Sequence, residues 1–452
     1  MCRFRPAARP RIILTSDRPM NIRIPEFCLV MLVGASGAGK TTFARRAFSA
    51  SDVVGSQQSG RAEQGRVPAV LSQVIAERLS QRRFTVVDAP NLARAERAAL
   101  MRLAKDHFAE AVAIVLDPDR EDCHRNNNAR QDAAVQPAVI DRQFEQLRRS
   151  VDGLAGEGFS DVYRLRARHQ IDAAEVTFSP LDCDRRGQSG PFDIIGDVHG
   201  CRDELMALLE RLGYKVALKG KGNRKTPRIE TPAGRRAIFV GDLVDRGPAS
   251  PDVLRIVMAM VEAGQAMCVL GNHDNKFMRW LQGRNVSLTH GLETTVAQFR
   301  HEPFELREPT RRFLESLPYQ LWLDDGRLVV AHAGIRSDMV GRMGGAVREF
   351  CLFGDRSGEK DADGLPVRYH WALDYDGAAT VVYGHTPVPE AAWVGNTLCV
   401  DTGCPFGGRL TALRWPEREI VSVPARSRYA RRVRAFGHPP PRPARTGAGI
   451  EA

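Results

Sequence analysis

The sequence lacks any long apolar run. Its longest apolar stretch covers residues 27–35, far short of the ~20 residues needed to cross a bilayer. No transmembrane helix and no membrane partner are therefore predicted. No internal repeat is visible either. With 43% hydrophobic and 26% charged residues, the composition excludes a wholly disordered, collagen-like or coiled-coil chain. The length of 452 residues suggests roughly two to four domains.

Paired cysteine motifs and a secretory signal peptide are also missing. The nine cysteines are scattered, without a CxxC pair, which favours reduced thiols and a cytoplasmic location. The net charge of +11 comes largely from the two ends of the chain, residues 1–19 and 424–452. Because the remainder is nearly neutral, the basic pI does not indicate a basic groove for nucleic acid.

Two α/β regions account for most of the chain. Residues 20–177 alternate apolar strand runs (27–33, 84–87, 112–116) with helical stretches (69–81, 95–109), which predicts a parallel sheet. Residues 178–190 are polar and predict a linker, and a second α/β region follows over 191–423. We expect residues 1–19 to be disordered or to precede a true start at Met20, and the Pro- and Arg-rich residues 424–452 to be disordered.

A phosphate-binding loop follows the first strand. Residues 34–41, GASGAGKT, fit GxxxxGK[ST] between a strand and a helix, which predicts a site for ATP with Mg²⁺. Asp88, at the end of the next strand, is either a metal carboxylate or a helix cap, and Arg130 is a candidate lid residue. The predicted nucleotide-binding residues are Gly34, Ser36, Gly37, Ala38, Gly39, Lys40, Thr41, Thr42, Asp88 and Arg130.

Five fragments of the second region place metal-ligating residues directly after apolar strands. They read FDIIGDVHG, AIFVGDLVDRG, MCVLGNHD, LVVAHAG and VVYGHTP. Strand ends at one edge of an α/β sheet converge, so these side chains are expected to meet. Asp, His and Asn without Cys suit hard-to-borderline ions such as Mn²⁺. Asp242 can bridge two ions, and such a pair acidifies a bound water and clamps a phosphoryl group.

Three residues near these ligands have predicted catalytic roles. Arg246 offers a bidentate fork for phosphate. His273, steered by Asp274, is placed to protonate the leaving oxygen. From the residues alone, the sequence therefore predicts a metal-dependent phosphoester hydrolase.

In this order the fragments resemble the calcineurin-like binuclear metallophosphoesterases. The chain as a whole resembles the kinase and phosphatase modules of the bacterial polynucleotide kinase-phosphatase of RNA repair. The resemblance covers residues 20–423 and includes MNIRIPEFCLVMLVGASGAGKTTFARRAF, PFDIIGDVHGCRDEL, DADGLPVRY and CVDTGCPFGGRLTALRWP. The third, nucleotidyltransferase module of that family is not seen here. The fold class implied is a P-loop NTPase-type parallel sheet followed by a calcineurin-like metallophosphoesterase α/β sandwich.

The resemblance also implies residue roles, cofactors and partners. It makes Asp197, His199, Asp242, Asn272, His332 and His385 the metal ligands. Arg246, His273 and Asp401 match positions that the family needs for phosphatase chemistry, with Asp401 either a direct or an outer ligand. Asp245 and Asp274 complete the predicted catalytic set. Two divalent ions, Mn²⁺ or Ni²⁺, and removal of phosphate from RNA ends, including 2′,3′-cyclic phosphates, are implied. RNA ends are the implied partners, together with a separate RNA ligase and ribose methyltransferase. The oligomeric state, a homodimer being one option, stays open.

The kinase module departs from the family pattern. Gln57 stands where the family has the Asp that takes the proton from the 5′-hydroxyl, and Gly60 stands where it has an Arg. An amide cannot act as a base, so we expect ATP binding with poor 5′ phosphorylation. Asp52 is a possible substitute. The lid also carries Asn126 and Ala133 at expected Arg positions.

Two alternatives to RNA-end healing stay open. One is a generalist phosphatase acting on phosphoproteins or dinucleoside polyphosphates, because those enzymes share the five fragments. The other is a non-catalytic role for the first module, in which nucleotide binding serves sensing or assembly.

Overall fold

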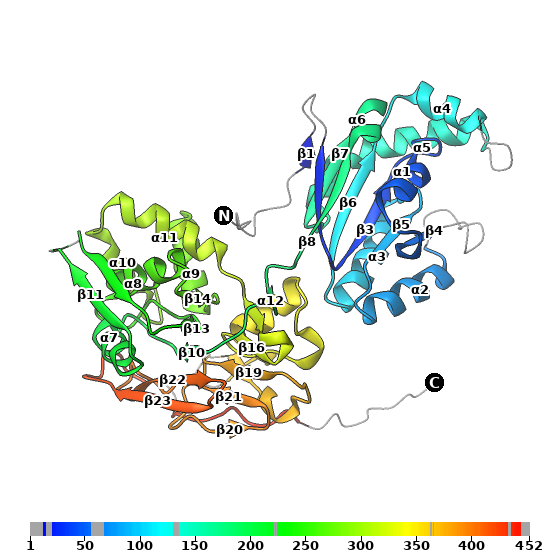
Figure 1. Cartoon of the computed structure of the whole chain (residues 1–452). Coiled ribbons are helices and arrows are strands. Elements are labelled where there is room, and N and C mark those ends of the chain that lie inside the picture. Colours follow the sequence, from blue (N-terminus) through cyan, green and yellow to red (C-terminus); the bar gives the residue numbers. More distant parts are fainter. Residues whose placement is uncertain are drawn as a thin grey trace. The chain divides into compact units, whose positions relative to one another are not determined.

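The computed structural model describes residues 12–14, 20–55, 67–129, 135–220, 222, 224–361, 364, 366–432 and 435–443. The chain divides into two compact units (Figure 1). One extends to Leu181 and the other begins at Asp182, with the short segment Arg342–Ala346 grouped with the first. Among the described residues, no helix has the length and apolar character needed to traverse a membrane.

The first unit is a parallel sheet flanked by helices (Figure 1). The strands lie in the order β1 (Ile12–Leu14), β7 (Asp161–Leu165), β6 (Glu110–Leu116), β3 (Cys28–Val33), β5 (Thr85–Asp88) and β4 (Val53–Gly55). The helices are α1 (Lys40–Ala47), α2 (Ala69–Ser80), α3 (Arg94–Asp106), α4 (Arg120–Asn128), α5 (Pro137–Ser150) and α6 (Arg168–Ala173). A separate two-stranded sheet joins β2 (Asn21–Pro25) to β8 (Glu175–Ser179). The predicted P-loop NTPase-type sheet is confirmed.

The central position of β3 explains where this unit carries its phosphate loop. β3 is hydrogen-bonded in parallel to both β5 and β6, and every residue of β3 is buried. The connection that follows β3 runs to β4 on one side, whereas the connection that follows β6 runs to β7 on the other, which opens a crevice at the carboxyl end of β3. The loop of residues 34–39 lies at that end, directly before α1.

The second unit is a sandwich of two sheets. One has the strand order β14 (Ala266–Cys268), β13 (Arg236–Phe239), β10 (Phe192–Ile195), β22 (Arg409–Trp415), β23 (Glu419–Pro424). The other has the order β20 (Trp393–Val394), β21 (Thr397–Cys399), β19 (Thr380–Tyr383), β16 (Leu328–Ala331), β15 (Gln320–Leu323), β9 (Asp184–Arg185). Two short hairpins pair β11 (Lys215–Lys219) with β12 (Thr226–Glu230), and β17 (Arg356–Lys360) with β18 (Pro366–Arg368). The helices are α7 (Arg202–Arg211), α8 (Ser250–Glu262), α9 (Asn272–Leu281), α10 (Leu292–Arg300), α11 (Phe304–Ser316) and α12 (Gly345–Phe353).

Alternate residues of β10 and β13 build two different cores. Ile194 and Ile238 pack with side chains of the facing sheet, such as Val330. Their neighbours Ile195 and Phe239 pack on the opposite side, with residues of α7 and α8. Successive side chains of a strand point to opposite faces, so a sheet covered on both sides needs continuous apolar strands. This explains why the sequence before each metal motif is apolar without alternation.

Two predictions about the ends of the first unit differ from the structure. Ile12–Leu14 forms the edge strand β1, paired with β7, although residues 1–19 were expected to be disordered or to lie before a start at Met20. The predicted linker 178–190 contains the end of β8 and all of β9, which pairs with β15. Both segments are too short to give a periodic pattern, so their strand pairing depends on neighbours that only the fold supplies.

The chain after Pro424 packs on the second unit over its described part, although 424–452 was predicted to be disordered. The Tyr429 hydroxyl donates to Glu204, 2.8 Å away, and the Arg442 guanidinium pairs with Asp355. Such a segment has no regular element and hence no apolar period. Its order comes from individual side chains that find partners on the surface of the domain.

Candidate functional site

The phosphate loop of the first unit adopts a conformation that depends on glycine. Gly37 and Gly39 have φ of 81° and 92°, in the left-handed region that favours glycine. A Cβ on Gly37 would lie 2.0 Å from the Cys123 carbonyl oxygen. The Lys40 ammonium, 9% exposed, donates to the carbonyls of Gly34 (2.7 Å) and Ala35 (2.8 Å). Lysine is therefore held within the loop where phosphates are expected.

Thr41 and Asp88 meet beside this loop. The Thr41 hydroxyl donates to Asp88 Oδ2 at 2.7 Å, although the residues belong to α1 and β5. A hydroxyl and a carboxylate in contact next to a phosphate loop can share a hydrated Mg²⁺. Asp88 therefore has the position of a metal carboxylate, the first of its two sequence-based interpretations. Thr42 is exposed on α1.

Two polar side chains contact the backbone of the loop in a way that the sequence did not indicate. Gln143, on α5, accepts the Ser36 backbone N–H through Oε1 at 2.7 Å. Asn126, on α4, donates to the Gly37 carbonyl at 2.8 Å. Neither residue type marks a nucleotide site by its spacing, so the sequence named Asn126 only as a lid position and missed Gln143. The Gln143 side chain therefore takes the hydrogen bond of the Ser36 N–H, which could otherwise be donated to a phosphate oxygen.

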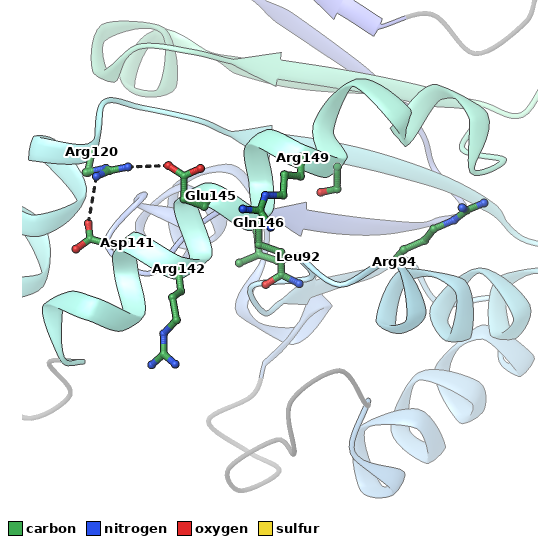
Figure 2. A pocket seen from close by; sticks show the side chains of 9 residues that line it. Leu92, Arg94, Arg120, Asp141, Arg142, Glu145, Gln146 and Arg149 are labelled. Carbon is green, nitrogen blue, oxygen red and sulfur yellow. Dashed lines mark hydrogen bonds and ion pairs between the residues drawn. The ribbon is translucent and has the colours of Figure 1, made fainter.

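A cavity of about 670 Å³ lies on the same unit. Figure 2 shows that α5 supplies Arg142, Gln146 and Arg149 to it, while Arg120 reaches across to Glu145. Its wall has four arginines and two carboxylates, Asp141 and Glu145, both of which pair with Arg120. The wall therefore keeps a net positive charge, which suits an anionic ligand. The cavity is lined by α5, the helix that also supplies Gln143 to the loop.

Several kinase predictions fall outside the described residues. Gln57, Gly60, Arg130 and Ala133 lie there, so the expected loss of the general base is untested. Asp52, the possible substitute, lies 3.6 Å from the guanidinium of Arg78.

In the second unit, all six predicted metal ligands gather at the ends of strands. They come from both sheets, not from one sheet edge as the sequence suggested. Asp197 and Asp242 follow β10 and β13 of one sheet, whereas His332 and His385 follow β16 and β19 of the other. His332 Nδ1 donates across the sandwich to the Val240 carbonyl at 3.0 Å. The sandwich therefore unites two sets of parallel strand ends.

Asp242 lies between two groups of ligands. Its Oδ2 is 3.5 Å from His199 Nε2 and 3.4 Å from His332 Nε2. On the second side, His332 Nε2 is 2.9 Å from Asn272 Oδ1 and 3.1 Å from His385 Nδ1. A carboxylate in this position would be shared by two ions if each group of ligands held one.

Backbone carbonyls determine which imidazole nitrogens can bind metal. His199 Nδ1 donates to the Val244 carbonyl at 2.8 Å, and His332 Nδ1 donates to that of Val240. Each Nε2 is then left with its lone pair, directed at Asp242. Burial lowers the pKa of His199, and it lowers the pKa of His332 to about 3, so both rings stay neutral.

The buried polar atoms of this cluster fit a pair of divalent cations. Asp197 Oδ1 and His385 Nε2 are buried without a hydrogen-bond partner. Burial, followed by the charges of Asp401 and Asp242, raises the pKa of Asp197. A buried carboxylate cluster is costly unless cations neutralise it. Ligand-metal bonds would satisfy both unpartnered atoms.

Backbone strain is concentrated here. Of the twelve non-glycine residues with positive φ in the described part of the chain, five belong to this site: His199, Asp242, Asp245, Arg246 and His385. Such conformations are unfavourable for residues with a Cβ and persist where surrounding contacts hold them. The site is therefore held in its geometry by the rest of the unit.

Arg246 and His273 line the same site. The Arg246 guanidinium contacts His199 Nε2 and lies 2.9 Å from His273 Nε2. The ring of Phe406, which the sequence reasoning missed, lies 5.0 Å from the Arg246 guanidinium carbon. A cation over an aromatic face is stabilised in a fixed orientation.

Asp245, not Asp274, orients His273. Asp245 Oδ2 is 2.6 Å from His273 Nδ1, whereas Asp274 accepts the backbone N–H groups of Leu243 (2.9 Å) and Gly271 (3.2 Å). Consecutive helical side chains point about 100° apart, and Asp274 is the third residue of α9, where an acid caps the helix start. The expectation that Asp274 steers His273 is wrong. Burial raises the pKa of Asp245 to about 7.

Asp401 is buried beside these groups, and the backbone holds its carboxylate. Its Oδ1 accepts the Gly403 N–H at 3.0 Å, and its charge is the second cause of the raised pKa of Asp197. Burial raises the pKa of Asp401 itself to about 6. Whether Asp401 is a direct or an outer ligand stays open.

Comparisons with known proteins agree with both units. Residues 29–154 match an AAA domain, and residues 190–389 match the calcineurin-like phosphoesterases. The Anoxybacillus flavithermus protein named bis(5′-nucleosyl)-tetraphosphatase PrpE [asymmetrical] is 48% identical over 250 residues, which cover 54% of this chain and 99% of that relative. Its Geobacillus thermodenitrificans counterpart is 52% identical over 52% of this chain and 94% of that relative. A solved putative diadenosine tetraphosphatase is 25% identical, with a TM-score of 0.39 over 54% of this chain and 96% of that structure.

The two units thus define a P-loop domain joined to a metal-dependent phosphoesterase. The chain belongs, through its second unit, to the calcineurin-like phosphoesterase family shared by these relatives. A family of metallophosphoesterases implies divalent metal ions in the site described above.

Gly384, directly before His385, leaves no room for a side chain beside the ligand Asp197. A Cβ on Gly384 would lie 1.9 Å from Asp197 Oδ1, so Gly384→Ala must displace a ligand oxygen. We expect Mn²⁺ affinity to fall by ~10–100-fold, since overpacking costs about 1–3 kcal/mol. Titration calorimetry measures it. Gly187→Ala, with no atom within 4 Å of the added Cβ, is the control. Equal affinity in both variants would contradict the close approach.

The contact between Asp245 and His273 should matter for catalysis more than for stability. Asp245→Asn presents an amide to His273 Nδ1 and disturbs its tautomer, so we expect kcat to fall by ~10²-fold with KM little changed. Asp274→Asn retains one acceptor oxygen for the backbone and should lower Tm more than kcat. Steady-state kinetics at matched metal content distinguish the two. A greater loss of kcat in Asp274→Asn would restore the original assignment.

Gln143 competes with phosphate for the backbone N–H of Ser36. Gln143→Ala frees the Ser36 N–H for phosphate, so we expect ATP to bind up to ~10-fold more tightly, as one hydrogen bond of about 1 kcal/mol allows. Equilibrium binding of ATP with Mg²⁺ measures this. Gln73→Ala, an exposed glutamine of α2 outside the cavity wall, is the control. Weaker ATP binding in Gln143→Ala would show instead that the amide contacts the nucleotide.

Proposed function

We propose that the second unit hydrolyses dinucleoside polyphosphates, with the tetraphosphates as the favoured class. The observation that carries this proposal is the 48–52% identity to two tetraphosphatases over 94–99% of their own length. The match therefore spans the whole domain and not only the metal fragments, which many phosphatases share. Phosphoprotein hydrolysis, the other part of this alternative, has no comparable support.

The residues of the site suit hydrolysis of a bridging phosphate. When bound, a pair of divalent ions, Mn²⁺ being preferred for these oxygen and nitrogen donors, supplies Lewis acidity for phosphoryl transfer to water. Arg246 presents its guanidinium toward the same space and can pair with phosphate oxygens. His273 Nε2, with Nδ1 held by Asp245, can hold and deliver a proton to the leaving oxygen.

The first unit has a chemical relation to this reaction. Off-centre hydrolysis of a tetraphosphate bridge releases a nucleoside triphosphate and a nucleoside monophosphate. A phosphate loop followed by the Thr41–Asp88 pair suits a nucleoside triphosphate with Mg²⁺. We propose that the first unit binds ATP in this way, as a sensor of nucleotide or as a kinase.

A second candidate is RNA-end healing, with polynucleotide kinase and 3′-phosphatase activities. The observation that favours it is the arginine-bearing cavity lined by α5, which suits a polyanionic acceptor (Figure 2). The same helix contacts the phosphate loop through Gln143. In that case RNA ends are the substrates, and a separate RNA ligase and ribose methyltransferase are the expected partners.

One experiment separates the two candidates. The full chain with Mn²⁺ is given, in separate reactions, diadenosine tetraphosphate, a phosphopeptide and an RNA bearing a 5′-hydroxyl and a 2′,3′-cyclic phosphate. We expect kcat/KM on the tetraphosphate to exceed that on the RNA by at least ~10-fold, about 1.4 kcal/mol in transition-state binding. The products should be ATP and AMP.

The controls identify the site responsible. Arg246→Ala should lose the tetraphosphatase activity, whereas Arg300→Ala, an exposed arginine of α10, should retain it. Faster opening of the cyclic phosphate would favour RNA-end healing. Faster release from the phosphopeptide would make the enzyme a protein phosphatase. Addition of ATP and Mg²⁺ to the RNA reaction, with mass analysis of the 5′ end, tests the kinase.

A further inference from the structure

A second cluster of metal-ligating side chains lies outside the proposed catalytic set. Cys201, Glu204 and Cys404 each bring one donor atom within 4.8 Å of the other two. Cys201 immediately precedes α7 and Glu204 lies three residues later, a spacing that puts both side chains on one face of a helix. Cys404 arrives from the loop after β21. Three donors from two distant segments therefore converge.

The carboxylate of this cluster is held with one oxygen unsatisfied. Glu204 is 1% exposed, and its Oε1 accepts both the Arg426 N–H and the Tyr429 hydroxyl at 2.8 Å. Its Oε2 is buried without a hydrogen-bond partner. Buried carboxylate oxygens are normally satisfied, and an ion is one of the few groups that can do so. The two donors to Oε1 leave Oε2 as the oxygen available to an ion.

The two thiols determine which ion suits the cluster. Cys201 and Cys404 are both fully buried, and their thiols are in contact with each other. Two sulfurs with one carboxylate oxygen form a soft-to-borderline donor set, which selects Zn²⁺. The phosphate-hydrolysing centre, by contrast, offers only nitrogen and oxygen.

We propose that Cys201, Glu204 and Cys404 form a zinc site, separate from the binuclear centre. With three protein donors, one tetrahedral position is left for a water molecule. The inference does not depend on which phosphate compound the enzyme hydrolyses, so it can fail or hold independently of the proposed function.

The position of the site gives it a structural consequence. Cys201 is two residues beyond His199, and Cys404 is three residues beyond Asp401. Through Glu204, the site also reaches the segment after Pro424, where Tyr429 donates its hydroxyl. Zinc therefore links two loops of the hydrolytic centre to the end of the domain. Binding to the folded state alone raises its stability.

The test measures metal in the full chain. Protein expressed with zinc is dialysed against Mn²⁺ to exchange the binuclear pair, and its zinc is measured by plasma mass spectrometry. We expect one zinc per chain to remain in the unaltered protein and in Cys268→Ser, a buried cysteine of the same core cluster. Cys404→Ser and Glu204→Gln should each lose it and have a lower Tm.

A spectroscopic measurement on the unaltered chain keeps the proposal testable if a variant does not fold. Protein refolded with Co²⁺ should show a thiolate-to-cobalt charge-transfer band. Absence of both the band and the retained zinc would overturn the proposal. So would a band of equal strength in Cys404→Ser, or an intact mass showing a Cys201–Cys404 disulfide in protein purified without oxygen.

Discussion

The second unit depends on one buried carboxylate placed between two imidazoles. Asp242 Oδ2 lies within 3.5 Å of Nε2 of both His199 and His332, which belong to different sheets of the sandwich. A negative charge at such depth is unfavourable unless cations accompany it. Burial also keeps the histidines neutral, with their lone pairs available. Divalent cations held here would therefore stabilise the folded unit as well as supply the chemistry of hydrolysis.

Close approach of backbones makes this arrangement possible. A Cβ on Gly271 would lie 2.3 Å from Asp242 Oδ1, and one on Gly384 would reach Asp197 Oδ1. Ligand-bearing loops therefore touch where only glycine leaves space. Several ligands also have positive φ, which shows that packing around the site sustains conformations that are locally unfavourable.

Much of this could be predicted from the sequence, because strand ends and ligand types are local features. The phosphate loop and the ligands after apolar strands were found in this way. What the sequence could not show depends on contacts between distant segments. The pairing of His273 with Asp245 depends on the direction of side chains along α9, and the Ser36–Gln143 bond joins β3's loop to α5. The order of residues after Pro424 depends on single contacts, such as Tyr429 with Glu204, that have no periodic signature.

The central claim is that Asp242 is shared by two metal ions. A crystal structure of the Mn²⁺-loaded chain, measured at the manganese absorption edge, tests it directly. The account predicts two anomalous peaks about 3.5–4 Å apart, with Asp242 between them and His199 and His332 on opposite sides. A single peak, or two peaks without Asp242 between them, would contradict it.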